Sequence, residues 1–431
     1  MRHERKQHAS NMRGRALRKV SSKQHLRFEK IIECRVMSQN VLASSFTKVR
    51  VNIGLLMLIL GVFFPKVLNE FVLLHFFGIK LHVEKEKNID GISVCKFKYG
   101  ARSSFCISMD FEIPIHGKLE RAPISQQAIS ELLKIADLND IPVTWAVVGK
   151  IVESAAPTYR ESFEQIVASK GKYELASHTF NHVDFSSCSQ EVAEQEILAS
   201  KKSLGRFMRP TSFVFPFERE AHHNVLAGHQ FTAYRGATES LGYPKKTHGM
   251  WNVSPTYFFS NRAFSLTALT LRIVLLRLVD LAIRYGCVLH IWGHPWAMDI
   301  QKDAIRYNRK VLLPLFNYIA KKRAKGLIWT CTMRELANYC EAQKNCTIQN
   351  IEMTDGEVTM HVNCEIKDRK FDFPPTASVR FSAPKRGKMS RARVFENGVE
   401  HSSNTTESGE PLILTLTFER PVKKIRVSMN P

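Results

Sequence analysis

Several common sequence signals are absent from this chain of 431 residues, and each absence narrows the class of protein. No Cys-x-x-Cys pair occurs, so a structural zinc ribbon has no support. The nine cysteines are odd in number and several lie in apolar stretches, which favours buried free thiols over a disulfide framework. Cys340 and Cys346 are close in sequence, but spacing alone does not establish that they pair.

Acidic residues are scarce at the N-terminus. Residues 1–50 hold about a dozen lysines and arginines against three acids, so roughly half of the net charge of +22 lies there. Such an arm is typical of a nucleic-acid tail or of the cytoplasmic flank of a membrane segment. Only Phe28 and Phe46 are interleaved with the charges, which argues against nucleic acid as a partner.

The early apolar runs are too short for an ordinary membrane-spanning helix. Residues 51–64 form an uncharged run of about 14, where a spanning helix needs ~20, and a second run follows at 71–77. A buried helix or a signal-peptide core is one interpretation, although no Ala-x-Ala cleavage pattern follows. We favour a membrane-associated segment at 51–85, with a disordered arm at 1–50 held inside by its charge. The catalytic part is then expected outside the cytoplasm, and a cytoplasmic protein is the alternative.

The rest of the chain has globular composition, with 44% hydrophobic and 24% charged residues. Its length predicts a large catalytic domain and an accessory module. Between 103 and 340 strand-like and helical runs alternate, which predicts parallel strands with helical crossovers. The predicted strands are 105–109, 143–148, 173–177, 212–215, 231–234, 288–292 and 327–330, and the helices include 125–138, 159–169, 191–204 and 304–322. This pattern leaves a barrel and a doubly wound sheet both open.

Two further segments have patterns of their own. Arg272, Arg277, Asp280 and Arg284 interrupt the apolar run at 266–285 at spacings of about one helical turn. This predicts an amphipathic helix packed on the domain, with a membrane-surface helix as the alternative. Residues 345–431 show alternating runs separated by turns, which predicts a small antiparallel β module such as a sandwich. The module could bind glycan or brace the catalytic domain.

Metal-site residue types follow several of the predicted strands. Asp110 and Glu112 follow the first strand, His178 and His182 the third, and His294 the sixth. Strand C-termini form the rim that carries the site in parallel α/β folds. An Asp-x-Glu on an extended strand end turns both carboxylates to one side, and two histidines four apart on a helical turn can reach one ion. Taken alone, the histidine pair is more simply explained as two surface histidines.

The chain resembles the polysaccharide deacetylase (NodB-homology) family, a carbohydrate esterase type, in four motifs with the same order and spacing. The motifs are Ser108-Met109-Asp110-Phe111-Glu112, the run at 174–182, the run at 212–216 and His294-Pro295-Trp296. The resemblance covers about 103–340. It implies a distorted (β/α) barrel, assigned to 95–340, and a hydrolase that uses one divalent metal to remove an N- or O-acyl group, most often acetyl, from a sugar polymer. The β module predicted at 345–431 lies outside the resemblance.

The same resemblance implies a role for each residue of the site. Asp110 is expected to be the general base, and Glu112, His178 and His182 the metal ligands. His294 is expected to protonate the departing amine; His290 competes for this role but precedes the strand end. One carboxylate and two imidazoles suit zinc, and iron, cobalt or nickel would also fit.

Substrate contacts and the arginine that holds the base are further expectations. A backbone N–H near Phe217 is expected to stabilise the oxyanion, with Pro216 and Trp296 also on the substrate side. The family places an arginine near the proline of its third motif to tether the base. Here that arginine is displaced, so Arg219 is assigned to the catalytic set, and Arg235, otherwise a substrate-binding residue, is the other candidate for pairing with Asp110. Glu112 also departs from the aspartate usual in the family.

We therefore expect a membrane-associated, metal-dependent amidohydrolase that acts on an N-acylated sugar or polysaccharide. Two alternatives remain within the same fold. One is a catalytically inactive carbohydrate-binding relative, suggested by the displaced arginine. The other is a deformylase or amidase whose substrate is lipid-linked or small.

Overall fold

The computed structural model describes residues 79–430, apart from gaps of which the longest are 113–121, 260–267, 296–303, 382–390 and 402–410. The arm at 1–50 and the apolar runs at 51–64 and 71–77 lie outside the described residues. Within the described ranges, no helix is both long and apolar enough to cross a membrane.

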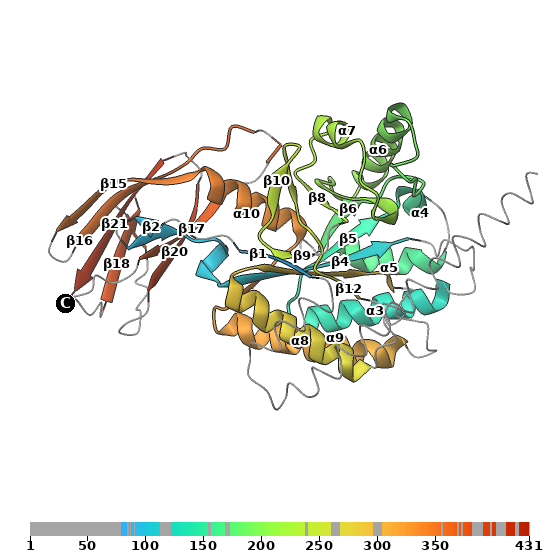
Figure 1. Ribbon diagram of the computed structural model, residues 1–431, viewed down its shortest axis with the longest axis horizontal. Helices are drawn as coiled ribbons and strands as arrows, with labels where there is room; N and C mark the ends of the chain where they lie inside the picture. The colour runs from blue at the N-terminus through green and yellow to red at the C-terminus, as the bar shows by residue number, and fades with distance from the viewer. Residues whose placement is uncertain are drawn as a thin grey trace, which may run out of the picture. The chain divides into compact units, whose positions relative to one another are not determined.

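The central element is a curled sheet whose core strands run parallel (Figure 1). All seven strands predicted between 103 and 340 are present: β4 (Ser103–Phe111), β5 (Val143–Val147), β6 (Tyr173–Ser177), β7 (Ser212–Val214), β8 (Ala233–Arg235), β13 (Val288–Gly293) and β14 (Ile328–Thr330). Their order is β13-β4-β5-β6-β7-β8, with β14 also paired to β4. The path of paired strands ends at two different edges, so the expected distorted (β/α) barrel is confirmed in an open form.

Helices connect these strands and cover the sheet. They are α3 (Ala122–Leu138), α4 (Gly149–Glu153), α5 (Pro157–Ala168), α6 (Gln190–Leu204), α7 (His223–Gly228), α8 (Ala268–Tyr285) and α9 (Ala304–Ala324). In Figure 1, α3, α8 and α9 lie together below the sheet, and α9 packs against both of the others. The predicted amphipathic helix forms as α8, which buries Leu271, Val274, Leu275 and Leu278 at the helical spacing.

Short strands at the sheet edges were not predicted. They are β1 (Lys80–His82), β9 (Ser240–Gly242), β10 (Lys245–Thr247), β11 (Met250–Asn252) and β12 (Tyr257–Phe258). β1 pairs in parallel with β9, so residues 80–82 belong to this sheet rather than to the apolar segment assigned at 51–85.

The C-terminal module is a sandwich of two antiparallel sheets. One sheet contains β15 (Cys346–Thr354), β16 (Glu357–Cys364), β21 (Val422–Asn430), β18 (Arg391–Glu396) and β19 (Val399–His401), and the other β2 (Asn88–Ile89), β3 (Ile92–Val94), β17 (Thr376–Phe381) and β20 (Leu412–Thr417). Ile92, Val379 and Leu414 share one core with Met360 and Ile425 of the opposite sheet. Residues 88–94 precede the barrel in sequence, so the module extends beyond the predicted 345–431.

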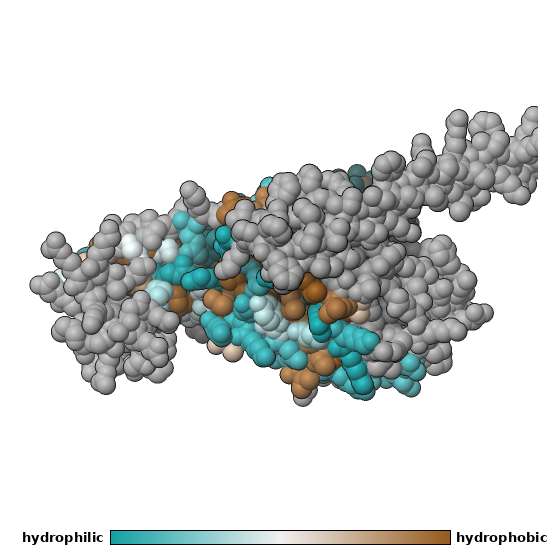
Figure 2. Space-filling view, turned by 60° about the horizontal axis from the view of Figure 1, so that its bottom comes forward, coloured by the Kyte–Doolittle hydropathy of each residue, from teal (hydrophilic) through white to brown (hydrophobic). Residues whose placement is uncertain are grey.

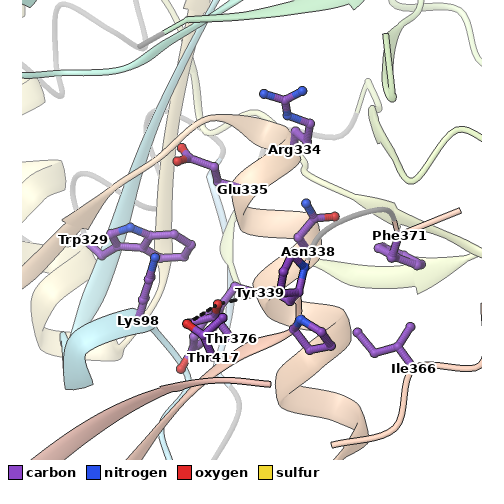
Figure 3. Close-up of a pocket in the computed structure, with 12 residues that line it drawn as sticks. Lys98, Trp329, Arg334, Glu335, Asn338, Tyr339, Ile366, Phe371, Thr376 and Thr417 are labelled. Atoms are coloured by element: carbon purple, nitrogen blue, oxygen red, sulfur yellow. Dashed lines mark hydrogen bonds between the residues drawn. The ribbon is translucent and has the colours of Figure 1, made fainter. Parts of the chain in front are cut away.

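Helix α10 (Met333–Asn345) joins the barrel to this module. Its Thr332–Glu335 capping box closes its N-terminus, and the Tyr339 hydroxyl donates to the carbonyl of Cys95 and accepts from the Ser378 N–H. A cavity of about 310 Å³ lies beside it, and Figure 3 shows Trp329 among its walls. Because Trp329 pairs with the start of β4, this cavity lies at the opposite end of the strands from Asp110.

Candidate active site

The predicted site residues meet at one rim because they end neighbouring parallel strands. Asp110 lies at the end of β4 and Glu112 directly follows it. His178 follows β6, Arg235 ends β8 and His294 follows β13. Since the strands run parallel, these carboxyl ends lie on the same side of the sheet.

Glu112, His178 and His182 form a cluster of side chains with the donor atoms of a metal site. Ligand atoms of Glu112, His178 and His182 all lie within 4.8 Å of one another. The Nε2 atoms of His178 and His182 are 3.3 and 2.6 Å from Oε2 of Glu112. A metal with bonds of about 2.1 Å holds tetrahedral ligands roughly 3.4 Å apart. The distance from His178 is close to this value, whereas the distance from His182 is shorter. Within the described ranges, no other group of histidine, cysteine and acidic side chains gathers in this way.

The chemistry of the donors also fits a cation. Both carboxylate oxygens of Glu112 are buried without a hydrogen-bond donor, although imidazole nitrogens lie close to them. Nδ1 of His178 lies 2.8 Å from the carbonyl of Val214, so it donates there and leaves Nε2 as the free lone pair. Buried oxygens without donors, beside an imidazole oriented in this way, are typical of a metal site.

His178 and His182 lie on a loop, and the predicted helical turn is wrong. Thr179 and His182 have φ angles of 60° and 62°, in the left-handed region. Glu196 of α6 holds this loop, because its carboxylate accepts hydrogen bonds from the N–H groups of Phe180 and Asn181 at 2.9 and 2.7 Å. The two imidazoles therefore converge through strained loop backbone rather than helical spacing. Glu196 gave no signal in the sequence.

Asp110 is held by Arg235, and the assignment of Arg219 to this role is corrected. The guanidinium of Arg235 donates to both carboxylate oxygens of Asp110, each at 2.7 Å, and both side chains are buried. Arg219 instead pairs with Asp184 at the surface. Arg235 follows the strand predicted at 231–234, so the sequence could place it on the rim. The sequence did not show that Asp110 is its partner.

A buried network on the far side of Arg235 fixes the guanidinium. Ser108 Oγ accepts from Arg235 at 3.0 Å and lies 2.9 Å from Nε2 of His290. Nδ1 of His290 lies 3.0 Å from the carbonyl of Val253, so it donates there and Nε2 accepts from the Ser108 hydroxyl. The ring of Trp292 lies 4.2 Å from the guanidinium carbon. His290 is therefore part of the support for Arg235.

The charges of the site shift the ionisation of its members. Burial raises the pKa of Asp110, but the adjacent Arg235 and the imidazoles outweigh it and hold that pKa below its usual value. Burial likewise opposes ionisation of Glu112, yet His178 and His182 lower its pKa. Burial lowers the pKa of His178, but the two carboxylates raise it overall. The ionised carboxylates of Asp110 and Glu112 therefore favour a bound cation or a protonated imidazole at this point.

His294 completes the rim beside both acids. Its Nε2 lies 3.6 Å from Oδ2 of Asp110 and 3.3 Å from Oε1 of Glu112. Burial lowers its pKa more than the carboxylates raise it, so the imidazole is neutral at pH 7. The rings of Phe258 and Trp292 lie beside it, each 5.7 Å away.

The residues expected on the substrate side are placed in part. Pro216 is buried, whereas Phe217 is 46% exposed and its ring lies 4.6 Å from that of His182. Phe217 has a φ of 57°, and its N–H has no hydrogen-bond partner in the described part of the chain. Trp296 lies outside the described residues.

Comparison with known proteins gives a family match for part of the chain. Residues 119–232, about a quarter of the chain, match the family model of polysaccharide deacetylases. This part of the chain is similar to the polysaccharide deacetylase family. The match includes His178 and His182, whereas Asp110, Glu112, Arg235 and His294 lie outside it and join the site through the fold. The similarity of the barrel domain to this family supports a hydrolase.

Solved structures described as such proteins match part of the chain, and no curated protein sequence matches it. A protein from Mycobacterium smegmatis described as a polysaccharide deacetylase is 15% identical, with 62% of this chain and 100% of that chain covered and a TM-score of 0.46. A family 4 carbohydrate esterase from Streptomyces lividans is 14% identical, with coverages of 53% and 91% and a TM-score of 0.32. A family pseudoenzyme from Bacillus anthracis is 13% identical, with coverages of 55% and 65% and a TM-score of 0.36.

Proposed function

We propose that the deacetylase domain is a metal-dependent amidohydrolase that removes an N-acyl group, with acetyl as the expected group, from a sugar or polysaccharide. The observation that carries the proposal is the pairing of two buried acids with different partners. Asp110 is bound by Arg235 on both oxygens, whereas Glu112 faces His178 and His182. Asp110 is thereby kept off the cation and remains available for proton transfer, whereas Glu112 remains available to bind the cation.

Glu112, His178 and His182 would hold one divalent metal, for which zinc is the expected ion. Iron, cobalt or nickel would also accept one carboxylate and two imidazoles. When bound, such an ion supplies Lewis acidity and lowers the pKa of a coordinated water. Three protein ligands leave positions open for water and substrate, as catalytic sites require.

Asp110 is the group suited to take a proton from the attacking water. Arg235 keeps its carboxylate ionised at neutral pH, so it is ready to accept. The N–H of Phe217, which has no hydrogen-bond partner in the described part of the chain, is the candidate donor to the oxyanion that develops on the acyl carbon. Both groups are set in place before substrate binds.

His294 is the group suited to protonate the leaving amine. Its lowered pKa means that it is neutral before reaction and needs a proton from a neighbour. Asp110 Oδ2, 3.6 Å away, is that neighbour after it has accepted the water proton. Since the pKa of Asp110 is held low, the carboxylic acid readily passes the proton on.

Acyl release from N-acetylated glucosamine oligomers, measured with and without a chelator, tests this proposal. Wild-type protein should release acetate, lose this activity with chelator and regain it with zinc. Asp110→Asn should reduce kcat by about 10²- to 10⁴-fold while zinc binding, measured by calorimetry, persists. Binding of sugar and zinc without any acyl release would instead support an inactive relative. Formylated and lipid-linked N-acyl sugars, assayed in parallel, identify the substrate if the free oligomers are not cleaved.

Membrane attachment through the segment at 51–85, with the deacetylase domain outside the cytoplasm, is a separate part of the proposal. Its support is the apolar run at 51–64 directly after a basic arm. Cell fractionation followed by protease protection tests it. A soluble protein, or a domain that protease reaches only from the cytoplasmic side, would contradict it.

A further inference from the structure

The outward face of α8 has a composition that the catalytic site does not explain. Its inward face packs on β4, β13 and α9. On the outward face, Leu269 and Ile273 are 56% and 40% exposed, and Leu276 and Ile283 are half-buried beside them. Spacings of four, three and seven residues place these four side chains along one stripe of the helix.

Basic side chains border this stripe. Arg277 and Arg284 are exposed and Arg272 is half-buried. As far as the structure is described, Arg272 and Arg277 have no acidic partner. Asp280, the acid in this helix, is held at 3.0 Å by Lys322 and accepts a hydrogen bond from the Tyr318 hydroxyl at 2.7 Å. The face is therefore apolar along its middle and positively charged at its edges.

Figure 2 turns the side of the molecule that carries α8 and α9 toward the viewer. Apolar side chains, in brown, are interspersed there with hydrophilic ones in teal. Apolar side chains on this side thus reach the surface instead of lying wholly beneath a polar layer. An exposed apolar stripe with a charged border is typical of an interaction surface.

The direction of α8 places its apolar end near the catalytic rim. The helix runs into β13, which starts at Val288 opposite Ser104 at the beginning of β4. The C-terminus of α8 thus lies at the start of the strands. An 18-residue helix is about 27 Å long and the six-residue β13 about 20 Å, so Leu269 lies at the level of the rim that holds Asp110.

We propose that this face, the α8 docking face (Leu269, Ile273, Leu276 and Ile283 with Arg272, Arg277 and Arg284), binds the surface of a membrane rich in anionic lipids. Helices of this composition lie in the interface with their apolar side about 5–10 Å deep and their basic side chains at the headgroups. Each basic side chain at such a surface strengthens binding about fivefold. A symmetric second copy fits less well, because a two-fold interface would bring the arginines of both copies together.

A tryptophan placed on the face tests the contact in the full chain. Leu269→Trp should show a blue-shifted emission on phosphatidylglycerol vesicles and quenching when the acyl chains are brominated. Leu198→Trp is the matched control, since Leu198 is 51% exposed on α6. The five native tryptophans contribute the same background to both variants. Because the signal comes from the substituted position, attachment of the chain through residues 51–85 does not produce it.

The charge contribution is tested in the same background. Arg272→Ala with Arg277→Ala should weaken docking of the face about 30-fold, from about 1 kcal/mol for each arginine. Quenching of Leu269→Trp no stronger than that of Leu198→Trp would overturn the proposal. So would equal quenching on neutral phosphatidylcholine vesicles. A blue shift that rises with protein concentration in the absence of vesicles would assign the face to a second copy instead.

Discussion

Asp110 stays ionised in a buried position because one guanidinium binds both of its oxygens. The planar fork of Arg235 matches the carboxylate, and Ser108 and Trp292 hold the fork from behind. A lysine would keep the charge but lose the second hydrogen bond and the stacking contact. The geometry of Arg235, in addition to its charge, is therefore expected to matter for activity.

Replacing Arg235 tests this expectation. Arg235→Lys should lower kcat/KM by about 10- to 100-fold, as is typical for residues that orient a catalytic group. The pKa of Asp110 should rise toward its usual value, so the acidic limb of the pH profile should move to higher pH. Arg219→Lys is the control and should leave the profile unchanged, since Arg219 pairs with Asp184 at the surface. An equal effect of both variants would contradict the assignment.

His290 makes stability depend on pH in a predictable direction. Burial and the nearby Arg235 lower its pKa from 6.5 to about 3. Between these values the unfolded chain binds a proton that the folded chain does not, so stability falls as pH drops below 6.5. This group alone should cost about 1.4 kcal/mol per pH unit in that window.

Urea unfolding at pH 7, 6, 5 and 4 measures this contribution. His290→Asn, which keeps a donor but has no titrating ring, should be less stable at pH 7 and should lose stability less steeply on acidification than wild type. Parallel stability curves for the two proteins would show that His290 is not the group responsible.

At the scale of elements, the loop after β6 decides whether two histidines reach one ion. Its left-handed residues Thr179 and His182 cost conformational energy, which Glu196 offsets by accepting hydrogen bonds from the loop backbone. Helix α6 carries no ligand of the proposed metal site, but its Glu196 carboxylate holds the backbone of the loop between the two histidines.

Removing this acceptor should weaken the metal site. Glu196→Gln replaces one oxygen with a donor that faces the N–H groups of the loop or the Asn181 amide, so zinc affinity should fall about 10- to 100-fold. Glu194→Gln, an exposed position on the same helix, is the control. Calorimetric titration with zinc measures both, and equal affinities in the two variants would contradict a role for Glu196.

At the scale of the molecule, barrel and sandwich share segments that are distant in sequence. β3 pairs with β17 across nearly 300 residues, and the Tyr339 hydroxyl of α10 bonds to the backbone of Cys95 and of Ser378 beside this pairing. The sandwich therefore depends on residues that precede the barrel. A chain ending near 344 would leave β3 without its partner strand β17.

Removing the hydroxyl oxygen of Tyr339 should weaken the connection between the barrel and the sandwich. Tyr339→Phe leaves the buried carbonyl of Cys95 and N–H of Ser378 without their partner, which should lower the free energy of unfolding by about 1–3 kcal/mol. Tyr99→Phe, an exposed position near the same joint, should change it little. Urea unfolding compares the two. Equal stabilities would show that the Tyr339 hydroxyl does not stabilise the joint.

Local patterns in the sequence were sufficient for the regular part of the fold and for the residue types of the site. The parallel strands β4 to β8 and β13 are buried on both faces and therefore appear as short apolar runs, whereas the long helices bury one face and show a helical period. Asp110, Glu112, His178 and His294 could be named because each lies at or directly after the end of such a strand, and His182 because it lies four residues after His178. Edge strands of two or three residues left no pattern to detect.

Only the tertiary structure decided which side chains and strands contact one another. The choice of Arg235 over Arg219, the loop shape that brings His178 and His182 together, and the entry of β3 into the sandwich all join segments far apart in sequence. Propensity and periodicity describe how a segment buries its own side chains, whereas these contacts depend on which segments meet when the sheet curls. The sequence by itself therefore determined the elements and the chemistry at their ends, and the packing of distant elements determined which side chains face one another.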